Sequence, residues 1–303
     1  MRMGVLDIGS NTGHLLVVDA FRGGPPVPAY SYKEPLRLAD DLDAGQAMTE
    51  EGVTRLVKYV LEAKAVAEDK GCTTIIAFAT SAVRDAVNVD AVIDRVNEAS
   101  GLNLQVLAGA DEASLTFLAV RRWFGWSAGR LGVFDIGGGS LELAAGSDET
   151  PEVAQSLPLG AGRLTRDWID AGRSTPELRL HVRSAIADEA GAILRGGSFD
   201  RAVATSKTFR SLARICGAAS SQDGQYVRRV LQKADLSRLV EELVTMRPEE
   251  IGKLPGVSPD RAHQMQAGAI VAEATMDLFD LVELEICPWA MREGVLLEHL
   301  DGL

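Results

Sequence analysis

The stretch GVLDIGSNT, from Gly4 to Thr12, recurs in this chain as GVFDIGGGS, from Gly132 to Ser140. Each copy runs from an apolar strand through an acid, Asp7 or Asp135, into a glycine-rich turn and another apolar stretch, which predicts a β-hairpin. Glycine permits close backbone approach at such a turn, where N–H groups can face an anion. The pattern therefore favours phosphate binding, with a hard cation bridging the phosphate and the acid.

The two copies lie about one domain length apart, which predicts two similar α/β domains, 1–126 and 127–303, with a cleft between them. One such turn alone is typical of an ordinary hairpin that needs glycine only for its geometry. Two acid-bearing copies favour ligand binding instead, and we expect the two turns to face each other. We also expect the last helix, about 290–300, to pack back on the first domain.

Composition and charge limit the classes of protein and partner. The chain has 303 residues, of which 46% are hydrophobic, and no segment approaches the roughly 18 apolar residues that span a bilayer. We therefore expect a globular, cytoplasmic protein with no membrane partner. A net charge of −12 disfavours nucleic acid as a partner, because such binding relies on Lys and Arg. The three cysteines lack the spacing of disulfide or zinc sites.

Hydrophobic periodicity predicts the order βββαβαβα in the first half, and the second half restarts that order. The first half has a predicted hairpin at 4–21, strands at 30–38, 73–80 and 102–107, and helices at 49–71, 89–100 and from about 111. The second half has a predicted hairpin at 131–146, strands at 153–159, 201–206 and 282–287, and helices at 176–194, 208–215, 236–246, 259–278 and 290–300. Both halves resemble the RNase H-like unit that is duplicated in the actin, Hsp70 and sugar-kinase superfamily.

Besides the two hairpins, the chain contains five further motifs. They are ATSAVRDA (79–86), ADEASLTFLAV (110–120), SLPLGAGRL (156–164), ATSKTFRSLA (204–213) and WAMREGVL (289–296). In this order and spacing the chain resembles the Ppx/GppA family of exopolyphosphatases and guanosine pentaphosphate phosphohydrolases, from Gly4 to Leu297. The resemblance implies hydrolysis of a terminal phosphoanhydride by water, with Mg²⁺, or Mn²⁺ in its place, and without a covalent enzyme intermediate.

The resemblance also implies roles for individual residues. Glu112 matches the catalytic glutamate that orients or deprotonates the attacking water. Taken alone, Glu112 is more typical of an acid stabilised by a helix N-terminus. Asp135 and Glu142 match acids with metal or water-positioning roles, and Asp7 is a further metal candidate. Arg84 matches the arginine that holds a phosphate, a role that suits its bidentate guanidinium.

The predicted phosphate lining comes from backbone turns and nearby cations. Its members are Gly9, Ser10, Asn11, Thr12, Gly137, Gly138, Gly139, Ser140, Gly160, Arg163, Ser206, Lys207, Thr208 and Arg210. Because phosphoryl transfer depends mainly on positioning and charge neutralisation, donors and cations of this kind are what the reaction needs.

Two positions depart from the family pattern and bear on the choice of substrate. Lys207 stands where many members have glycine, and Ser114 stands where arginine often follows the Glu-Ala pair. The chain also stops where longer members carry an additional helical region, so we expect short inorganic polyphosphate as the substrate. A homodimer is a family-level expectation.

Three other functions stay open from the sequence. One is removal of the γ-phosphate of the guanosine pentaphosphate alarmone, and another is a kinase of the same superfamily. The third is a non-catalytic sensor of polyphosphate or of guanosine penta- or tetraphosphate. A P-loop NTPase is disfavoured, because SKT at 206–208 lacks the preceding glycines of that motif.

Overall fold

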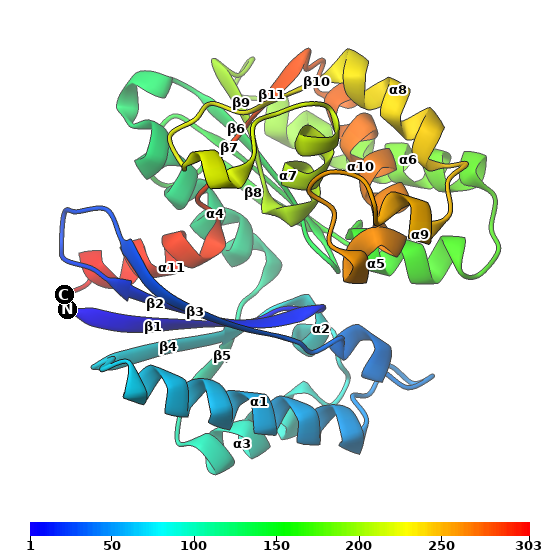
Figure 1. Ribbon diagram of the computed structural model, residues 1–303. Coiled ribbons are helices and arrows are strands. Elements are labelled where there is room, and N and C mark those ends of the chain that lie inside the picture. Colours follow the sequence, from blue (N-terminus) through cyan, green and yellow to red (C-terminus); the bar gives the residue numbers. More distant parts are fainter. The chain divides into compact units, whose positions relative to one another are not determined.

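The computed structural model describes residues 1–303 and divides into two compact units (Figure 1). Unit 1 comprises Met1–Glu112 and Arg292–Leu303, and unit 2 comprises Ala113–Met291. The C-terminal residues therefore belong to the same unit as the N-terminal ones. The division falls within helix α4, Gly109–Phe124. The sequence-based domain limit at 126/127 stays a prediction.

Unit 1 is built on a five-stranded sheet with the order β3-β2-β1-β4-β5. The strands are β1 Arg2–Ile8, β2 Thr12–Asp19, β3 Val27–Pro35, β4 Thr74–Ala79 and β5 Leu104–Val106. The first three pair antiparallel, whereas β4 runs parallel to β1 and β5 runs parallel to β4. Since parallel strands end at the same edge of a sheet, the turn after β1 lies beside the segment that follows β4.

Helices cover both faces of this sheet. They are α1 Glu50–Asp69, α2 Ser81–Arg84, α3 Val89–Ser100 and α11 Met291–Asp301, with a 3₁₀ turn, η1, at Leu38–Asp41. Helix α1 begins where the sequence predicted, because the Thr49 hydroxyl accepts a hydrogen bond from the Gly52 amide (3.2 Å). Helix α3 ends at Gly101, which adopts φ 66°. Figure 1 shows α1 and α3 on one face of the sheet and α11 on the other.

Unit 2 is built on a six-stranded sheet with the order β10-β11-β9-β6-β7-β8. The strands are β6 Leu131–Ile136, β7 Leu141–Gly146, β8 Val153–Leu157, β9 Arg201–Thr205, β10 Val230–Gln232 and β11 Glu283–Ile286. The first three again pair antiparallel, and β9 runs parallel to β6 and to β11. Strand β10 adds an antiparallel edge.

The helices of unit 2 are α4, most of which lies in this unit, α5 Ala161–Leu164, α6 Thr175–Leu194, α7 Ser206–Ile215, α8 Lys233–Leu243, α9 Pro248–Ile251 and α10 Met265–Leu278. The 3₁₀ turns are η2 Trp126–Ala128, η4 Ser221–Asp223 and η5 Pro259–Gln264, and a π-helical turn, η3, spans Thr165–Ile169. The helix predicted at 259–278 thus begins as a 3₁₀ turn before it becomes α-helical. No helix of the chain has the length and apolar character needed to cross a membrane.

The two sheets share one strand order, which confirms the predicted duplication. The series β3-β2-β1-β4-β5 corresponds to β8-β7-β6-β9-β11, with the same mixture of antiparallel and parallel pairs. One predicted element is wrong in its extent. We expected a strand to continue through Arg37, but β3 ends at Pro35 and Arg37 adopts φ 51° at the start of η1. A left-handed residue cannot continue an extended strand.

Each sheet has its own apolar core. In unit 1, Leu6 and Ile8 of β1 pack with Leu56 and Val60 of α1. Because side chains alternate along a strand, Asp7 lies on the opposite face from this core. In unit 2, Ile136 of β6 belongs to a larger cluster that includes α6, α7 and α10. The acid of each hairpin is therefore held in a strand whose neighbouring residues are buried.

The approach of α1 to the start of β2 depends on a glycine. A Cβ atom added at Gly13 would lie 2.2 Å from the Tyr59 ring. We expect Gly13→Ala to lower the free energy of unfolding by about 1–3 kcal/mol, because the ring must move within a packed core. Gly191→Ala is the matched control: Gly191 lies in α6 with open space around the added atom. It should stabilise by about 0.5–1 kcal/mol. Urea unfolding of both variants measures the difference, and equal effects would contradict the close-contact argument.

Candidate active site

The first glycine turn, Gly9 to Thr12, follows β1 and is closed by a hydrogen bond from the Gly9 amide to the Thr12 carbonyl (3.1 Å). The Ser10 hydroxyl lies 2.8 Å from that of Ser81, at the start of α2. The Thr80 amide donates to the Ile8 carbonyl (3.1 Å). The turn is thus joined directly to the segment that carries Arg84, as the parallel pairing of β1 with β4 requires.

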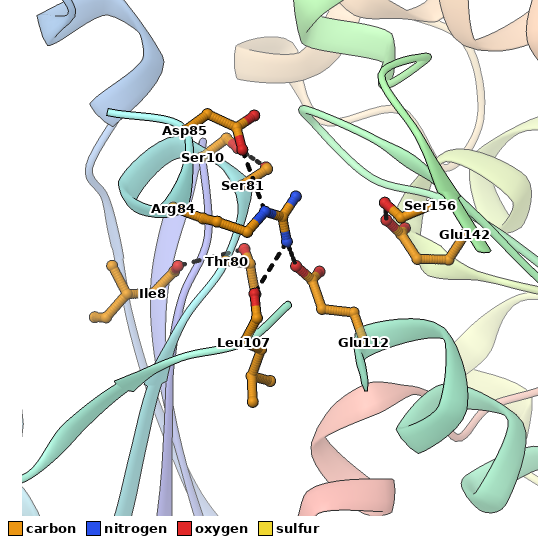
Figure 2. Close-up of polar contacts among 10 residues, drawn as sticks. All are labelled: Ile8, Ser10, Thr80, Ser81, Arg84, Asp85, Leu107, Glu112, Glu142 and Ser156. Atoms are coloured by element: carbon orange, nitrogen blue, oxygen red, sulfur yellow. Dashed lines mark hydrogen bonds and ion pairs between the residues drawn. The ribbon is translucent and has the colours of Figure 1, made fainter. Parts of the chain in front are cut away.

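The guanidinium of Arg84 connects this segment to Glu112. It donates from Nη1 to the Glu112 carboxylate and to the Leu107 carbonyl (3.1 Å), and from Nε to Asp85 (3.2 Å) (Figure 2). Burial by itself lowers the pKa of Arg84, but the negative charges of Glu112 and Asp85 outweigh it and hold the pKa above its usual value. Arg84 is therefore a fixed, permanently charged donor.

Glu112 lies in the first turn of α4 and is 6% exposed. Its amide donates to the Ala108 carbonyl (3.0 Å), which begins the helix. An acid in a first helical turn is favoured by the helix dipole, and this one also has a charged partner in Arg84. The structure therefore brings two predicted catalytic residues, Arg84 and Glu112, into direct contact within unit 1.

Asp7, near the end of β1, has a cationic partner that the sequence did not indicate. Arg292, in the first turn of α11, donates from Nη1 to the Asp7 carboxylate (3.2 Å). The motif WAMREGVL contains this arginine, but a motif match alone gives no contact. Ser81, which contacts Ser10 of the first turn, lies in the motif ATSAVRDA, but the sequence assigned it no role.

The second glycine turn repeats the geometry of the first. The Gly137 amide donates to the Ser140 carbonyl (2.9 Å), the equivalent of the bond that closes the first turn. Backbone amides at the start of α5 donate back to this turn, from Ala161 to Gly137 (3.0 Å) and from Arg163 to Gly138 (2.9 Å). A Cβ added at Gly160 would lie 2.2 Å from the Gly139 carbonyl carbon. Only glycine at 160 permits this close packing of two backbone segments.

Two carboxylates flank the second turn. Asp135 on β6 and Glu142 on β7 are directly opposite in the antiparallel register, so their side chains share one face of the sheet. Glu142 is 6% exposed and accepts a hydrogen bond from the Ser156 hydroxyl (2.9 Å) (Figure 2). No cluster of three His, Cys, Asp or Glu residues that could hold a metal is present. Mg²⁺ commonly uses one or two carboxylates together with substrate phosphates, and the Asp135–Glu142 pair fits that requirement.

Four residues of the predicted phosphate lining, Ser206, Lys207, Thr208 and Arg210, lie in the first turns of α7, directly after β9. Ser206 adopts φ 78°, and its carbonyl accepts from Arg210 Nε (3.0 Å). Lys207 donates to the Gly256 carbonyl (2.9 Å). Burial first, and then the positive charges of Arg210 and Arg261, lower the pKa of the Lys207 ammonium group. Thr208 is buried, and its methyl group faces Gly268 of α10.

The predicted site residues thus form one group in each unit, at the edge where the parallel strands end. The group in unit 1 comprises the first turn, Arg84 and Glu112. The group in unit 2 comprises the second turn, Asp135, Glu142 and the start of α7. The expectation that the two turns face each other stays a prediction, as do the roles of the individual residues.

Comparison with known proteins identifies the family. The family model described as the Ppx/GppA phosphatase family matches residues 17–302. The chain belongs to this family. It is 52% identical to a protein named Exopolyphosphatase 1 from Mycobacterium tuberculosis, over 100% of this chain and 89% of that protein.

Two more distant relatives of the family are also similar. The crystal structure of an exopolyphosphatase from Cytophaga hutchinsonii has a TM-score of 0.87 and 25% sequence identity, and the match covers 100% of this chain and 99% of that one. A protein named guanosine-5'-triphosphate,3'-diphosphate pyrophosphatase from Vibrio atlanticus is 28% identical over 98% of this chain and 59% of its own length. The predicted duplicated RNase H-like fold is therefore confirmed.

The Arg84–Glu112 pair predicts energetic coupling between unit 1 side chains. We expect Arg84→Met and Glu112→Gln each to destabilise the protein, because each leaves a partly buried group without its charged partner. The double variant should be less destabilised than the sum, with a coupling of about 1–3 kcal/mol in urea unfolding. The exposed pair Arg2–Asp19 is the control, and it should show little coupling. Additive effects at Arg84 and Glu112 would mean that the pair does not persist in solution.

Proposed function

We propose that this protein is an exopolyphosphatase that releases orthophosphate from the ends of short inorganic polyphosphate chains. The observation that carries the proposal is the 52% identity, over the whole chain, to a protein named Exopolyphosphatase 1. The arrangement of Arg84 and Glu112 beside a glycine turn supports it chemically, because a phosphate-binding cation and a water-activating carboxylate are both needed.

The proposed reaction assigns one task to each residue of this pair. The guanidinium of Arg84 binds the terminal phosphoryl group, because its planar N–H donors can form hydrogen bonds to two phosphate oxygens at once. Glu112 orients a water molecule and accepts its proton as the water oxygen attacks the terminal phosphorus. The bridging P–O bond breaks, and its electron pair remains on the shortened chain. Orthophosphate and a polyphosphate one unit shorter are the products.

The resting pair suggests how binding and catalysis are linked. Without substrate, the carboxylate of Glu112 is engaged by Arg84. When a phosphoryl group competes for the same guanidinium, the carboxylate is released toward the attacking water. Substrate binding therefore provides the condition under which Glu112 becomes a more effective base, since a carboxylate that accepts a charge-assisted hydrogen bond is a weaker proton acceptor.

The remaining charge of the substrate requires further neutralisation. We infer that Asp135 and Glu142 hold Mg²⁺, or Mn²⁺ in its place, with the substrate phosphates completing the coordination. The cation would lower the cost of charge that develops on the phosphate oxygens. The second glycine turn and Lys207 offer backbone amides and an ammonium group, which are suitable donors to phosphate oxygens.

A second candidate is hydrolysis of the 5′ γ-phosphate of the guanosine pentaphosphate alarmone. It is favoured by the 28% identity to the Vibrio atlanticus protein named as a guanosine-5'-triphosphate,3'-diphosphate pyrophosphatase. Both reactions cleave a terminal phosphoanhydride, so the same Arg84 and Glu112 chemistry would serve either one.

A phosphate-release assay on four substrates tests the proposed function. Purified protein with Mg²⁺ is given short polyphosphate, long polyphosphate, the pentaphosphate alarmone or ATP at equal concentrations. We expect kcat/KM to be highest for short polyphosphate, by about tenfold or more over ATP, because ATP presents only three linked phosphoryl groups to the same donors. No release from polyphosphate would refute the proposal, and a higher kcat/KM for the alarmone would support the second candidate.

Substitutions separate the two catalytic roles. Glu112→Gln should lower kcat by about 100-fold or more with little change in KM, because the amide keeps the shape but cannot accept a proton. Arg84→Ala should raise KM by about tenfold and lower kcat as well, since it removes a charged phosphate contact. Arg2→Gln, at the far end of β1, serves as the control that leaves both parameters unchanged. Identical effects of the two site variants on kcat alone would contradict this division of roles.

A further inference from the structure

The acid of the first hairpin is paired with an arginine from the other end of the chain. Arg292 Nη1 donates to Asp7 Oδ2 at 3.2 Å, and the side chains are 23% and 16% exposed. Both residues belong to unit 1. The sequence predicted a divalent cation at Asp7, so this contact assigns a different positive charge to the same carboxylate.

The sheet and α11 together make the contact. Leu6 and Ile8 point into the core beneath α1, so the alternation of side chains places Asp7 on the other face of β1. Figure 1 shows that α11 covers this other face. Arg292 lies in the first turn of α11, which starts near the edge where β1 ends. The pair is therefore a consequence of how the C-terminal helix packs on the N-terminal sheet.

One donor of the Arg292 guanidinium has no partner within the protein. The guanidinium donates to Asp7 from Nη1, while its Nε is buried without a hydrogen-bond partner. An arginine has five N–H donors, and burying one without an acceptor is unfavourable. A buried donor without an acceptor in a native protein requires an explanation. A bound ligand that offers hydrogen-bond acceptors to Arg292 would provide it.

A divalent cation is a poor alternative partner for Asp7. Mg²⁺ binds carboxylate oxygens at about 2.0–2.1 Å, so it would lie close to the guanidinium that already engages Asp7. Two positive charges in contact with one carboxylate repel each other. The Glu142 carboxylate of unit 2 accepts a hydrogen bond from the uncharged Ser156 hydroxyl (2.9 Å). The residues around Asp7 thus fit a bound arginine better than a bound metal.

We propose that Arg292 is a phosphate-positioning residue of the first glycine turn, and that Asp7 orients its guanidinium instead of binding the divalent cation. The inference rests on the proposed function, because it takes polyphosphate as the ligand. In addition to Arg84, it assigns a second arginine to the phosphate-binding groups of unit 1. It also restricts the metal-binding acids to Asp135 and Glu142.

Binding without turnover provides the first test. The affinity for a short polyphosphate of defined length is measured by calorimetry, once with EDTA and once with Mg²⁺. We expect Arg292→Gln to raise Kd about tenfold or more in both conditions. Arg292→Lys should raise Kd less, because lysine keeps the positive charge but lacks the planar guanidinium that donates to two oxygens at once. Asp7→Asn should raise Kd by a smaller factor than Arg292→Gln, since the arginine remains but loses its orientation. Arg2→Gln is the control. It breaks the exposed pair between Arg2 of β1 and Asp19 of β2, and its Kd should stay within about twofold of that of the parent protein.

Metal affinity provides the second test. The Mg²⁺ concentration that gives half-maximal metal binding is measured by calorimetry for the parent and for three variants. Asp7→Asn should leave it within about twofold, whereas Asp135→Asn and Glu142→Gln should raise it about tenfold or more, because each removes a carboxylate ligand. A tenfold rise in Asp7→Asn, with unchanged polyphosphate affinity, would overturn the inference and return Asp7 to the metal site.

The outcomes distinguish this inference from the proposed function. A parent protein that binds polyphosphate, with Arg292→Gln binding it equally well, overturns the role of Arg292 alone. A parent protein that neither binds nor hydrolyses polyphosphate overturns the proposed function, and the inference with it. Circular dichroism and the melting temperature show whether each variant is folded, and Arg292→Lys provides the charged variant if Arg292→Gln does not fold.

Discussion

The parallel pairing of β1 with β4 is the constraint on which the candidate site of unit 1 depends. It ends both strands at one edge, so that Ile8 and Thr80 are joined by a backbone hydrogen bond. The glycine turn and α2 then begin from adjacent points, and the Ser10–Ser81 contact joins them. If the pairing slipped by one residue, Asp7 would move to the core face and the site would be lost. The same parallel relation between β6 and β9 organises unit 2.

Ion pairs hold two arginine side chains in place at this edge of unit 1. Arg84 is held by Glu112, Asp85 and a backbone carbonyl, and Arg292 is held by Asp7. If these arginines bind phosphate as proposed, contacts that already hold them in place would reduce the entropy lost on binding. Both guanidinium groups are partly buried, so a phosphate that reached them would interact in surroundings of lower dielectric than water.

The two copies of the fold differ in the charges that they carry. In unit 1 the acid of the hairpin is neutralised by an arginine, whereas in unit 2 the equivalent acid, Asp135, lies opposite a second carboxylate, Glu142. The hairpins have the same turn geometry, because the amide of the first glycine of each turn donates to the carbonyl of the residue three positions later. The same backbone hairpin therefore carries an arginine-paired acid in unit 1 and two facing carboxylates in unit 2.

The sequence by itself determined the hairpins, most helix and strand positions, and the duplicated fold. These follow from local patterns: glycine turns, the Thr49 cap and the period of apolar residues are all readable along the chain. Very short elements such as α2 and β10 were missed, because their periodicity is too brief to detect. Only the tertiary structure decided the contacts Arg84–Glu112 and Arg292–Asp7, since these join residues far apart in the chain. The physical reason is that strand pairing and helix packing, and not local sequence, decide which distant side chains meet.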